Sequence, residues 1–594
     1  MQVYYRNNRL EKTLIGINAL TAAAVTATFV MRFGFHDPLI EVLILHYTQV
    51  ALLCVFIVEK IIRLFNAISK AEFLRANWFE IPLLLALGLA VFAAGRWFVE
   101  VDPMAVRHFA VSIYLVLQVV IKVCRTAVNL AASGRSPTRT LIASFLVLII
   151  SGAGLLMLPR ASATENVSFV DALFTATSAT CVTGLIVKDT GSDFSFMGQL
   201  IILSLIQLGG LGIVVFGAVF ALLLGQALSL RERVAMQDLL SARTLGRISS
   251  MIAFIFFGTL LIEAVGAISL FGMWDDSPGW IGNFHQQIFC SVFHSISAFC
   301  NAGFSLFSDS FVGYNKSWAA YVVICPLIIL GGVGFSVLYD LVSIASDRTK
   351  RFFKRRFYKQ YRLSMEAPIR MQLQTKIVLS VSALLIVLGM LGVLVFERYA
   401  PAGNPGQSPG VHGAFFQSVT ARTAGFNTIN VSAMSTSSKF ILILLMFIGG
   451  SPGSTAGGIK TVTLAVVIMT ALAALMKRQE VEMFKRSISI AVVGRAITVT
   501  LLFAAVLFTA TLALSITENA NGFSMSDIFF ETGSALGTVG LTTGITPSLT
   551  TAGKLIIIAV MLIGRLGPLT LLAALTFNVK PARYNYPEEA IIVG

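Results

Sequence analysis

The sequence has few charged residues for its length. Asp, Glu, Lys and Arg together make up 12% of the 594 residues, against 56% hydrophobic residues, whereas a soluble domain carries about 25% charged residues. So few charges cannot cover a chain of this size in water, and the mean hydropathy is +0.83. The composition therefore excludes a soluble protein and predicts one that lies largely in lipid.

Cysteine pairs and enzyme motifs are also missing. The six cysteines include no CxxC pair, so nothing indicates a disulfide framework. The sequence has no P-loop, no aspartyl-phosphate motif and no soluble ATPase domain. His294 stands alone without an HExxH motif, so an intramembrane enzyme is not indicated. We therefore predict no catalytic activity and no cofactor of the chain's own, and any nucleotide coupling would come from another chain.

The net charge of +15 does not indicate nucleic acid, because the positive residues lie between apolar runs and not on one soluble face. Basic residues cluster in loops near 60–75, 231–247, 348–370 and 477–486, and such loops mark the cytoplasmic side of membrane proteins. The opposite connections carry Glu100, Asp102, Asp275 and Asp276. We expect a multi-pass protein of the plasma (inner) membrane with both termini in the cytoplasm and no nucleic-acid partner.

Apolar runs predict about twelve membrane-crossing helices. They lie near residues 13–33, 40–64, 79–99, 108–131, 138–158, 199–224, 249–272, 318–342, 374–397, 438–475, 491–515 and 553–577. The first is predicted to be a retained helix, not a signal peptide, because many spans follow. Four outward connections after residue 138 are too apolar for ordinary loops and too short to span. We expect each to be a short helix that dips into the membrane and returns as extended backbone.

These four connections form an internal repeat. They read FTATSATCVTGL at 174–185, FHSISAFCNAGF at 293–304, FFQSVTARTAGF at 415–426 and FETGSALGTVGL at 530–541. Each places a Phe ten residues before a Gly, and the glycines are 119, 122 and 115 residues apart. The helices that follow share a glycine motif: QLGGLG at 207–212, LGGVG at 330–334, IGGSPG at 448–453 and IGRLGP at 563–568. Close packing of membrane helices explains a single small-residue motif, but not four copies in register.

The glycine-centred loops suit a cation filter. A cation that crosses a bilayer needs its hydration shell replaced, and rings of backbone carbonyls do this in channels with TVGYG loops. Glycine reaches the backbone angles that such a ring requires. The fourth loop is similar to that signature, and the others are degenerate, which suggests a shorter filter. The predicted filter residues are Val182, Thr183, Gly184, Leu185, Asn301, Ala302, Gly303, Phe304, Thr423, Ala424, Gly425, Phe426, Thr538, Val539, Gly540 and Leu541.

Over roughly residues 138–580, these repeats with loops that end TGL, AGF, AGF and VGL resemble the Trk/Ktr/HKT superfamily of potassium transporters. The resemblance implies an all-α polytopic membrane protein with four helix–pore loop–helix repeats around one central pore, preceded here by about four extra helices. It also implies a homodimer and a separate cytosolic nucleotide-binding regulatory subunit. Gly184 stands where sodium-selective plant members have Ser, so potassium selectivity is expected.

Two further features match the same family. Residues Gly449–Gly458 contain Pro452 and five glycines, which cannot form a regular helix. The resemblance implies an intramembrane gate below the filter; a plain kink between packed helices is the alternative. Arg565 lies mid-span, where it either forms an electrostatic barrier or pairs with Asp340 or a backbone carbonyl. The predicted gate comprises Gly449, Gly450, Ser451, Pro452, Gly453, Ser454, Thr455, Ala456, Gly457, Gly458, Lys460 and Arg565.

Four other side chains lie in the predicted loops. Arg422 and Glu531 are expected to brace the loops as a buried pair, although a carboxylate near the pore mouth would instead draw cations in. Cys181 and Cys300 occupy equivalent positions three residues before their glycines, where we expect small side chains behind the filter.

The domain boundaries follow from the repeats. Residues 1–135 form an extension in which Glu59 and Arg63 lie one helical turn apart. The extension loosely resembles a voltage sensor, but its fourth helix has only Arg107, Lys122 and Arg125, so a scaffold is favoured. The other predicted units are repeat 1 at 136–228, repeat 2 at 229–346, a basic cytoplasmic loop at 347–373, repeat 3 at 374–486, repeat 4 at 487–580 and a cytoplasmic tail at 581–594.

The function that these features predict is potassium uptake, channel-like or sodium-assisted, with K⁺ held by backbone carbonyls. A sodium-permeable transporter of the same family is the nearest alternative. A non-conducting membrane scaffold or receptor is the alternative from another class, but it would have no use for four filter loops.

Overall fold

The computed structural model describes residues 5–78, 80–93, 107–119, 137–164, 166–212, 218–219, 248–274, 283–357, 368–399 and 410–575. The regular secondary structure of these residues is helical apart from one antiparallel hairpin, formed by β1 (Val481–Met483) and β2 (Arg486–Ile488). The prediction of an all-α polytopic membrane protein is confirmed.

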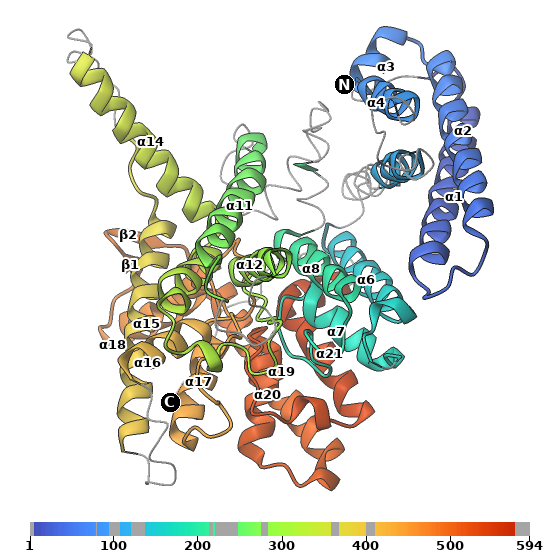
Figure 1. Cartoon of the computed structure of the whole chain (residues 1–594). Helices are drawn as coiled ribbons and strands as arrows, with labels where there is room; N and C mark the ends of the chain where they lie inside the picture. The colour runs from blue at the N-terminus through green and yellow to red at the C-terminus, as the bar shows by residue number, and fades with distance from the viewer. Residues whose placement is uncertain are drawn as a thin grey trace, which may run out of the picture.

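The N-terminal extension forms a bundle beside the repeats (Figure 1). It contains α1 (Asn8–Phe33), α2 (Val42–Asn66), α3 (Lys70–Ala76), α4 (Glu80–Ala93) and a helix at Arg107–Val119. The predicted contact of Glu59 with Arg63 is present at 2.6 Å, and Arg63 also lies 3.3 Å from Glu11. This arginine therefore ties α2 to α1.

Each repeat has a first helix, a short pore helix and a second helix. Repeat 1 has α6 (Pro137–Leu156), α7 (Phe169–Thr180) and α8 (Phe196–Leu211). Repeat 2 has α11 (Ile248–Leu270), α12 (Phe284–Phe299) and α13 (Cys325–Val333). Repeat 3 has α15 (Leu373–Arg398), α16 (Val411–Thr420) and α17 (Thr436–Phe447). Repeat 4 has α19 (Ile490–Thr517), α20 (Met525–Gly537) and α21 (Thr551–Leu566). The four short pore helices lie where the sequence predicts short helices in the outward connections.

The remaining elements continue or connect these helices. They are α14 (Phe335–Phe357), α18 (Thr461–Leu475), α22 (Pro568–Leu575), the π-helix η4 (Ala320–Ile324) and the 3₁₀ turns η1 (Pro159–Ala161), η3 (Val312–Tyr314), η6 (Asn519–Asn521) and η7 (Thr546–Ser548). Helix α14 projects away from the body of the repeats (Figure 1). The segment from 347 that was predicted as a basic loop therefore begins as the last part of α14.

Several of the about twelve expected spans are interrupted at second helices of the repeats. Within the described part of the chain, five helices are long and apolar enough to cross a membrane, or six if a pair bent by 101° counts as one. That bent pair replaces the expected span at 318–342, because α13 ends at Gly334 with φ +94°. The expected span at 553–577 breaks at Gly567, with φ +83°, and α8 ends before Gly212, with φ +82°. The expected span at 438–475 divides into α17 and α18.

Several predicted features lie outside the described residues. They are the basic segment at 231–247, part of the basic loop at 358–367, the tail at 581–594, the acidic residues Glu100, Asp102, Asp275 and Asp276, and the basic residues Lys122 and Arg125.

Candidate functional site

The four predicted filter loops have the same unusual backbone. Each follows the end of a pore helix, and in each the repeat glycine has a positive φ, with values of 91°, 71°, 82° and 94° at Gly184, Gly303, Gly425 and Gly540. The residue two before the glycine also has a positive φ, with values of 57°, 59°, 77° and 50° at Val182, Asn301, Thr423 and Thr538. The residue between them does not. A non-glycine residue in this region costs about 1–3 kcal/mol and persists only where its surroundings hold it, so four copies point to a functional constraint.

The four glycines lie against one another in a closed ring. A Cβ added to Gly184 would collide with the carbonyl oxygen of Ala302 and lie 3.0 Å from the Cα of Gly303. The same relation repeats around the ring: Gly303 lies against Ala424 and Gly425, Gly425 against Val539 and Gly540, and Gly540 against Thr183 and Gly184. No side chain fits at any of the four positions. The predicted arrangement of four repeats around one centre is therefore confirmed, while the role of the ring as a filter stays a prediction.

A hydroxyl on each pore helix holds the loop that follows. Ser178 Oγ accepts from the Gly184 N–H at 3.1 Å, and Ser534 Oγ accepts from the Gly540 N–H at 3.1 Å. In the other two repeats the hydroxyl donates to the residue after the glycine: Ser297 to Phe304 O at 2.8 Å and Thr420 to Phe426 O at 2.6 Å. Sequence reasoning missed these four residues, although three of them recur four positions after the repeat Phe.

The register of the third repeat differs from the one predicted. Phe174, Phe293 and Phe530 are fully buried, and their counterpart is Phe416, not Phe415, which is only partly buried. Counted from Phe416, Thr420 falls at the position of the anchoring serines. The third loop is therefore one residue shorter: Ala424 N–H donates to Thr420 O, four residues back, whereas Val539 N–H reaches Ser534 O, five residues back.

Replacing Ser534 by Ala is expected to destabilise the fourth loop. The buried Gly540 N–H would lose its partner, which costs about 1–3 kcal/mol, and the carbonyls of that loop would be less well fixed. We expect a lower melting temperature and a lower potassium-to-sodium selectivity in liposome flux assays. Ser204→Ala is the control, because Ser204 is exposed on α8 and bonds within its own helix to Leu200 O at 2.8 Å. Equal melting temperatures and selectivities for the two variants would contradict the anchoring role.

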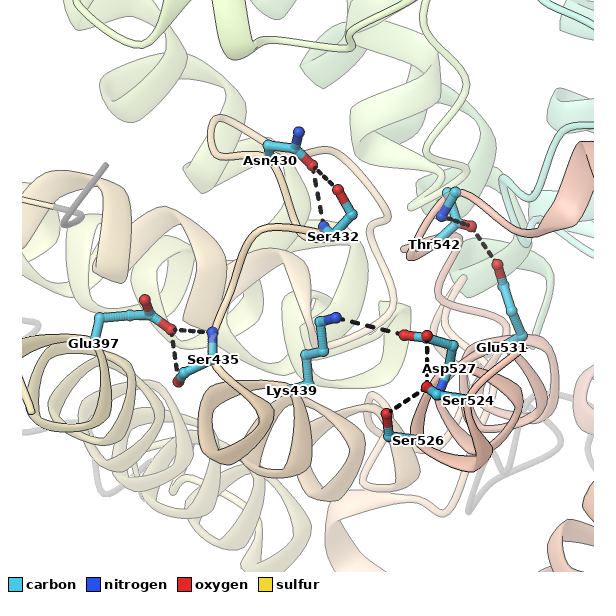
Figure 2. A network of polar contacts seen from close by, with 11 residues as sticks. Glu397, Asn430, Ser432, Ser435, Lys439, Ser524, Ser526, Asp527, Glu531 and Thr542 are labelled. Carbon is cyan, nitrogen blue, oxygen red and sulfur yellow. Dashed lines mark hydrogen bonds and ion pairs between the residues drawn. The ribbon is translucent and has the colours of Figure 1, made fainter. Parts of the chain in front are cut away.

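The position after the buried Phe is polar in all four pore helices. Its occupants are Thr175, His294, Gln417 and Glu531, each 1% exposed or less. His294 Nε2 accepts from the Leu306 N–H at 3.3 Å and lies 3.2 Å from Ser305 Oγ. Glu531 accepts from the hydroxyl of Thr542 (Figure 2). It also accepts from the hydroxyl of Thr546 at 2.8 Å. In repeats 2 and 4 these side chains brace the chain just beyond the filter glycine.

The predicted pair of Arg422 with Glu531 is wrong. Among the described residues, Arg422 donates to Ser382 Oγ at 3.2 Å and to Ser382 O at 3.4 Å, so it braces α15 within repeat 3. Glu531 braces repeat 4, as above, and its second oxygen Oε2 is buried with no hydrogen-bond partner among the residues that the structure describes. The two side chains serve different repeats, because each pore helix packs mainly on its own flanking helices.

Two ion pairs join neighbouring repeats near the N-terminal ends of pore helices. Lys439 of α17 lies 3.4 Å from Asp527 of α20, which ties repeat 3 to repeat 4 (Figure 2). Lys554 of α21 lies 2.7 Å from Asp171 of α7, which ties repeat 4 to repeat 1. Each lysine is fourteen residues after its repeat glycine and each aspartate is three before the buried Phe, so the two pairs are equivalent.

The predicted gate segment is a non-helical loop between α17 and α18. Residues 448–460 carry no helical turn, so the segment is longer than a kink. Ser451 N–H donates to Gly332 O at 2.9 Å, its hydroxyl donates to Val333 O, and Phe335 N–H donates to Gly453 O at 2.9 Å. These bonds fix the loop to the break between α13 and α14.

The other side of this loop faces the filter. Thr455 Oγ1 donates to Phe299 O, at the end of pore helix α12, at 3.4 Å. A Cβ on Gly457 would collide with the Thr538 side chain of the fourth filter loop. Lys460 Nζ donates to Ala456 O at 2.7 Å, within the loop itself. The loop therefore contacts the second and fourth pore-helix ends.

Arg565 binds backbone carbonyls of two other repeats. Its guanidinium donates to Thr455 O in the loop, to Gly209 O at 2.5 Å and to Gly210 O at 3.3 Å. The alternative partner Asp340 is engaged elsewhere: it accepts from Gln372 N–H at 3.1 Å and from Thr375 Oγ1 at 2.7 Å. Of the two predicted partners of Arg565, the backbone carbonyl is the one present, and it links the loop to α8, while the barrier role stays a prediction.

The glycine motif of the second helices has a packing reason. A Cβ on the first glycine would collide with a carbonyl of its own pore helix: Gly209 with Thr180 O, Gly331 with Phe299 O and Gly564 with Leu536 O. The next position is Gly210 in repeat 1, Gly332 in repeat 2 and Arg565 in repeat 4. The arginine thus replaces a glycine of the repeat, and its side chain reaches the carbonyls of Thr455, Gly209 and Gly210.

The predicted cysteines lie behind the loops with one further acidic residue. Cys181 and Cys300 are fully buried and follow the last residues of α7 and α12. Gln207 Nε2 donates to Glu263 Oε2 at 3.1 Å, and Cys300 Sγ lies 3.6 Å from Gln207 Oε1. Glu263 was not predicted, although an acidic residue inside the apolar run at 249–272 is visible in the sequence.

Comparison with known proteins agrees with this architecture. The family model for the cation transport protein TrkH matches residues 104–583. Ktr system potassium uptake protein B of Bacillus subtilis is 38% identical over 77% of this chain and 97% of its own length. Potassium/sodium uptake protein NtpJ of Enterococcus hirae is 36% identical over 77% of this chain and 97% of its own length.

A solved structure shows the same fold. The crystal structure of the potassium transporter TrkH from Vibrio parahaemolyticus covers 84% of this chain and 98% of its own, with a TM-score of 0.56 and 19% identity. The family match extends over most of the chain and includes all four repeats. The chain is therefore a multi-pass membrane protein that belongs to the TrkH family of cation transport proteins.

Proposed function

We propose that this chain takes up potassium across the membrane through the ring of four filter loops. The observation that carries the proposal is the ring itself, in which four glycines with positive φ leave no room for a side chain. Relatives named as potassium uptake proteins support potassium as the ion. Growth of an uptake-deficient strain at low potassium tests the proposal, and failure of the well-expressed chain to restore growth would reject it.

In this mechanism the filter replaces water around the ion. Backbone carbonyl oxygens of the predicted filter residues take the place of the hydration shell, apart from those of Phe304 and Phe426, which accept from Ser297 and Thr420. Alternating left- and right-handed residues turn neighbouring carbonyls toward the same side of the chain, which lets one short loop offer more than one oxygen to the axis. The anchoring hydroxyls and the braces from His294 and Glu531 hold the loops in this conformation. Transport is driven by the electrochemical gradient, with or without coupled sodium.

Sodium permeability is the second candidate, because one relative is named a potassium/sodium uptake protein. Gly184 favours potassium, since a hydroxyl-bearing side chain at this position would break the carbonyl ring. Parallel potassium and sodium flux measurements in liposomes discriminate the two functions. Equal permeability to both ions would replace the first proposal by the second.

We propose further that the loop at 449–458, with Lys460 and Arg565, is the gate. The loop contacts filter residue Thr538 on one side and Arg565 on the other. It is unwound backbone at membrane depth, which is tolerated where it lines a water-filled cavity. Its bonds to the start of α14 supply a route by which movements outside the membrane reach the pore.

Deletion of Gly453–Gly457 is expected to raise potassium flux several-fold, because the loop obstructs the cavity below the filter. Selectivity should change little, since the filter residues are retained. Flux per folded molecule in liposomes is the measurement. Ser454→Ala is the control, because it keeps the loop length and loses only a bond to Ser451 O at 2.7 Å. Unchanged flux of the deletion variant at equal expression would leave the loop as packing alone.

We also propose how the protein assembles and in which membrane it lies. The family resemblance supports a homodimer and a separate cytosolic nucleotide-binding regulatory subunit. The distribution of basic loops supports the plasma membrane with both termini in the cytoplasm. The projecting basic helix α14 is a candidate contact for a regulatory subunit, because its first residue bonds to the loop.

A further inference from the structure

A cationic pocket lies away from the ion pathway, where α14 passes the segment that leads into α15. Its cavity of about 360 Å³ is lined by nine residues, of which four are Arg or Lys and one is Asp. None of the filter or gate residues contributes to it. The pocket is therefore a separate feature of the fold.

Most of the positive charge in this pocket is uncompensated. Asp347 is engaged by Arg351, whose Nε lies 2.7 Å from Oδ2, and by the Ile369 N–H at 3.3 Å. The other three basic residues, Arg348, Arg370 and Lys376, form no ion pair in the part of the chain that the structure describes, and all are exposed. Three cationic groups thus line one cavity whose single carboxylate, Asp347, is already paired with Arg351.

The same pocket has an apolar wall at the level where the chain enters lipid. Ile369 is 43% exposed and Met371 is 37% exposed. Helix α15 begins two residues later at Leu373 and is long and apolar enough to cross a membrane. A ligand that fills the pocket therefore meets cations on one side and hydrocarbon on the other.

We propose that this pocket binds the phosphate headgroup of an anionic phospholipid. Arg348 and Arg370 each present a planar guanidinium that suits bidentate contact with phosphate oxygens, and Lys376 adds a point charge from the first turn of α15. The exposed Ile369 and Met371 favour a lipid over a free phosphate, because a soluble anion gains nothing from an apolar wall. Basic pockets at the cytoplasmic ends of membrane helices are suited to such headgroups.

The pocket is connected to the loop through α14. This helix starts at Phe335, whose N–H donates to Gly453 O at 2.9 Å, and it forms the pocket about two turns later, from Ile344 onward. Between these points Asp340 accepts from Gln372 N–H and Thr375 Oγ1, which locks α14 to the start of α15. A lipid that fixes α14 would therefore bias the loop, an effect that rests on the proposed gate.

Lipid binding is tested on the full-length protein with the triple variant Arg348→Gln/Arg370→Gln/Lys376→Gln. The matched control, Lys477→Gln/Lys485→Gln/Arg486→Gln, removes three exposed charges around the β1–β2 hairpin. Native mass spectrometry measures binding of phosphatidylglycerol, phosphatidylcholine and inorganic phosphate. Size exclusion and melting temperature check folding.

We expect the triple variant to bind phosphatidylglycerol about a hundredfold more weakly, since each basic residue near an anionic lipid contributes about a factor of five. The control should bind like wild type, and phosphatidylcholine should bind weakly to all three proteins. Equal phosphatidylglycerol binding by wild type and the triple variant would overturn the site. Inorganic phosphate binding as tightly as the lipid would overturn the lipid assignment.

Flux in liposomes with and without phosphatidylglycerol tests the connection to the loop. We expect the lipid to change the flux of wild type and of the control but not of the triple variant. Lipid binding without any change in flux would overturn the connection while leaving the site intact. Loss of potassium flux in every lipid would instead reject the proposed function, so the two failures are distinguishable.

Discussion

A Gly184→Ser variant is expected to lose most of its preference for potassium over sodium. Gly184 has φ +91°, and an added Cβ would collide with Ala302 O and approach the Cα of Gly303 to 3.0 Å. The ring must open to accept the side chain, so its carbonyls no longer fit one ion size. A difference of about 1.4 kcal/mol between the energy barriers for the two ions changes their relative rates tenfold. Backbone strain of this kind costs about 1–3 kcal/mol, so it is large enough to remove such a difference.

The permeability ratio in liposomes is the measurement, with Gly544→Ser as the matched control. Gly544 has φ +96° but no atom within 4 Å of an added Cβ, so its variant carries the backbone strain without the crowding. We expect this control to retain the wild-type ratio. A wild-type ratio in a folded Gly184→Ser protein, or the same loss in both variants, would reject the filter assignment at this loop.

An Arg565→Ala variant is expected to conduct potassium several-fold faster with selectivity nearly intact. At an effective dielectric constant of about 20, two unit charges roughly 4 Å apart repel by about 4 kcal/mol, and a quarter of this slows flux several-fold. The variant also frees the loop, since the bond to Thr455 O is lost. None of the predicted filter residues takes part in these contacts, so the variant leaves them unaltered.

The alternative, in which Arg565 only braces the fold, predicts destabilisation instead. The partners at Thr455, Gly209 and Gly210 are neutral carbonyls, so the variant leaves no unpaired buried charge and we expect it to fold. Arg565→Lys separates charge from bracing, because an ammonium keeps the barrier but cannot span both sets of carbonyls. Flux and size exclusion are measured together. A well-folded Ala variant with flux at or below wild type would rule out the barrier.

The repeated part of this fold was predictable because its constraints are local. A left-handed backbone at Gly184 and its three counterparts forces glycine, and glycine recurs visibly in the sequence. The sequence aligned the third repeat on the wrong phenylalanine, because Phe415 and Phe416 are adjacent. Only the structure shows that Phe416 is the buried one. Broken second helices were missed because hydropathy does not register the positive φ at Gly334 and Gly567.

The partners of the buried polar side chains could not be predicted from the sequence for a different reason. The partners of Arg422, Glu531 and Arg565 depend on how the ring closes and which helix passes each guanidinium or carboxylate. A polar residue within an apolar run indicates that a polar partner is present. It does not indicate which residue that partner is. The Glu263–Gln207 contact was within reach of that rule, whereas the carbonyls bound by Arg565 were not.

One chain supplies all four quarters of the ring, and the quarters are not copies. In the part of the chain that the structure describes, the long loop at 448–460 is found in repeat 3 alone, and in the sequence only repeat 4 has an arginine at the second glycine position. In a tetramer of identical subunits every mutation appears four times around the axis. A residue in one quarter therefore cannot be changed without the same change in the other three quarters. When the four repeats lie in one chain, each quarter can instead change independently of the others. Selection can therefore act on the loop of repeat 3 or the arginine of repeat 4 while the ring glycine is kept in all four quarters.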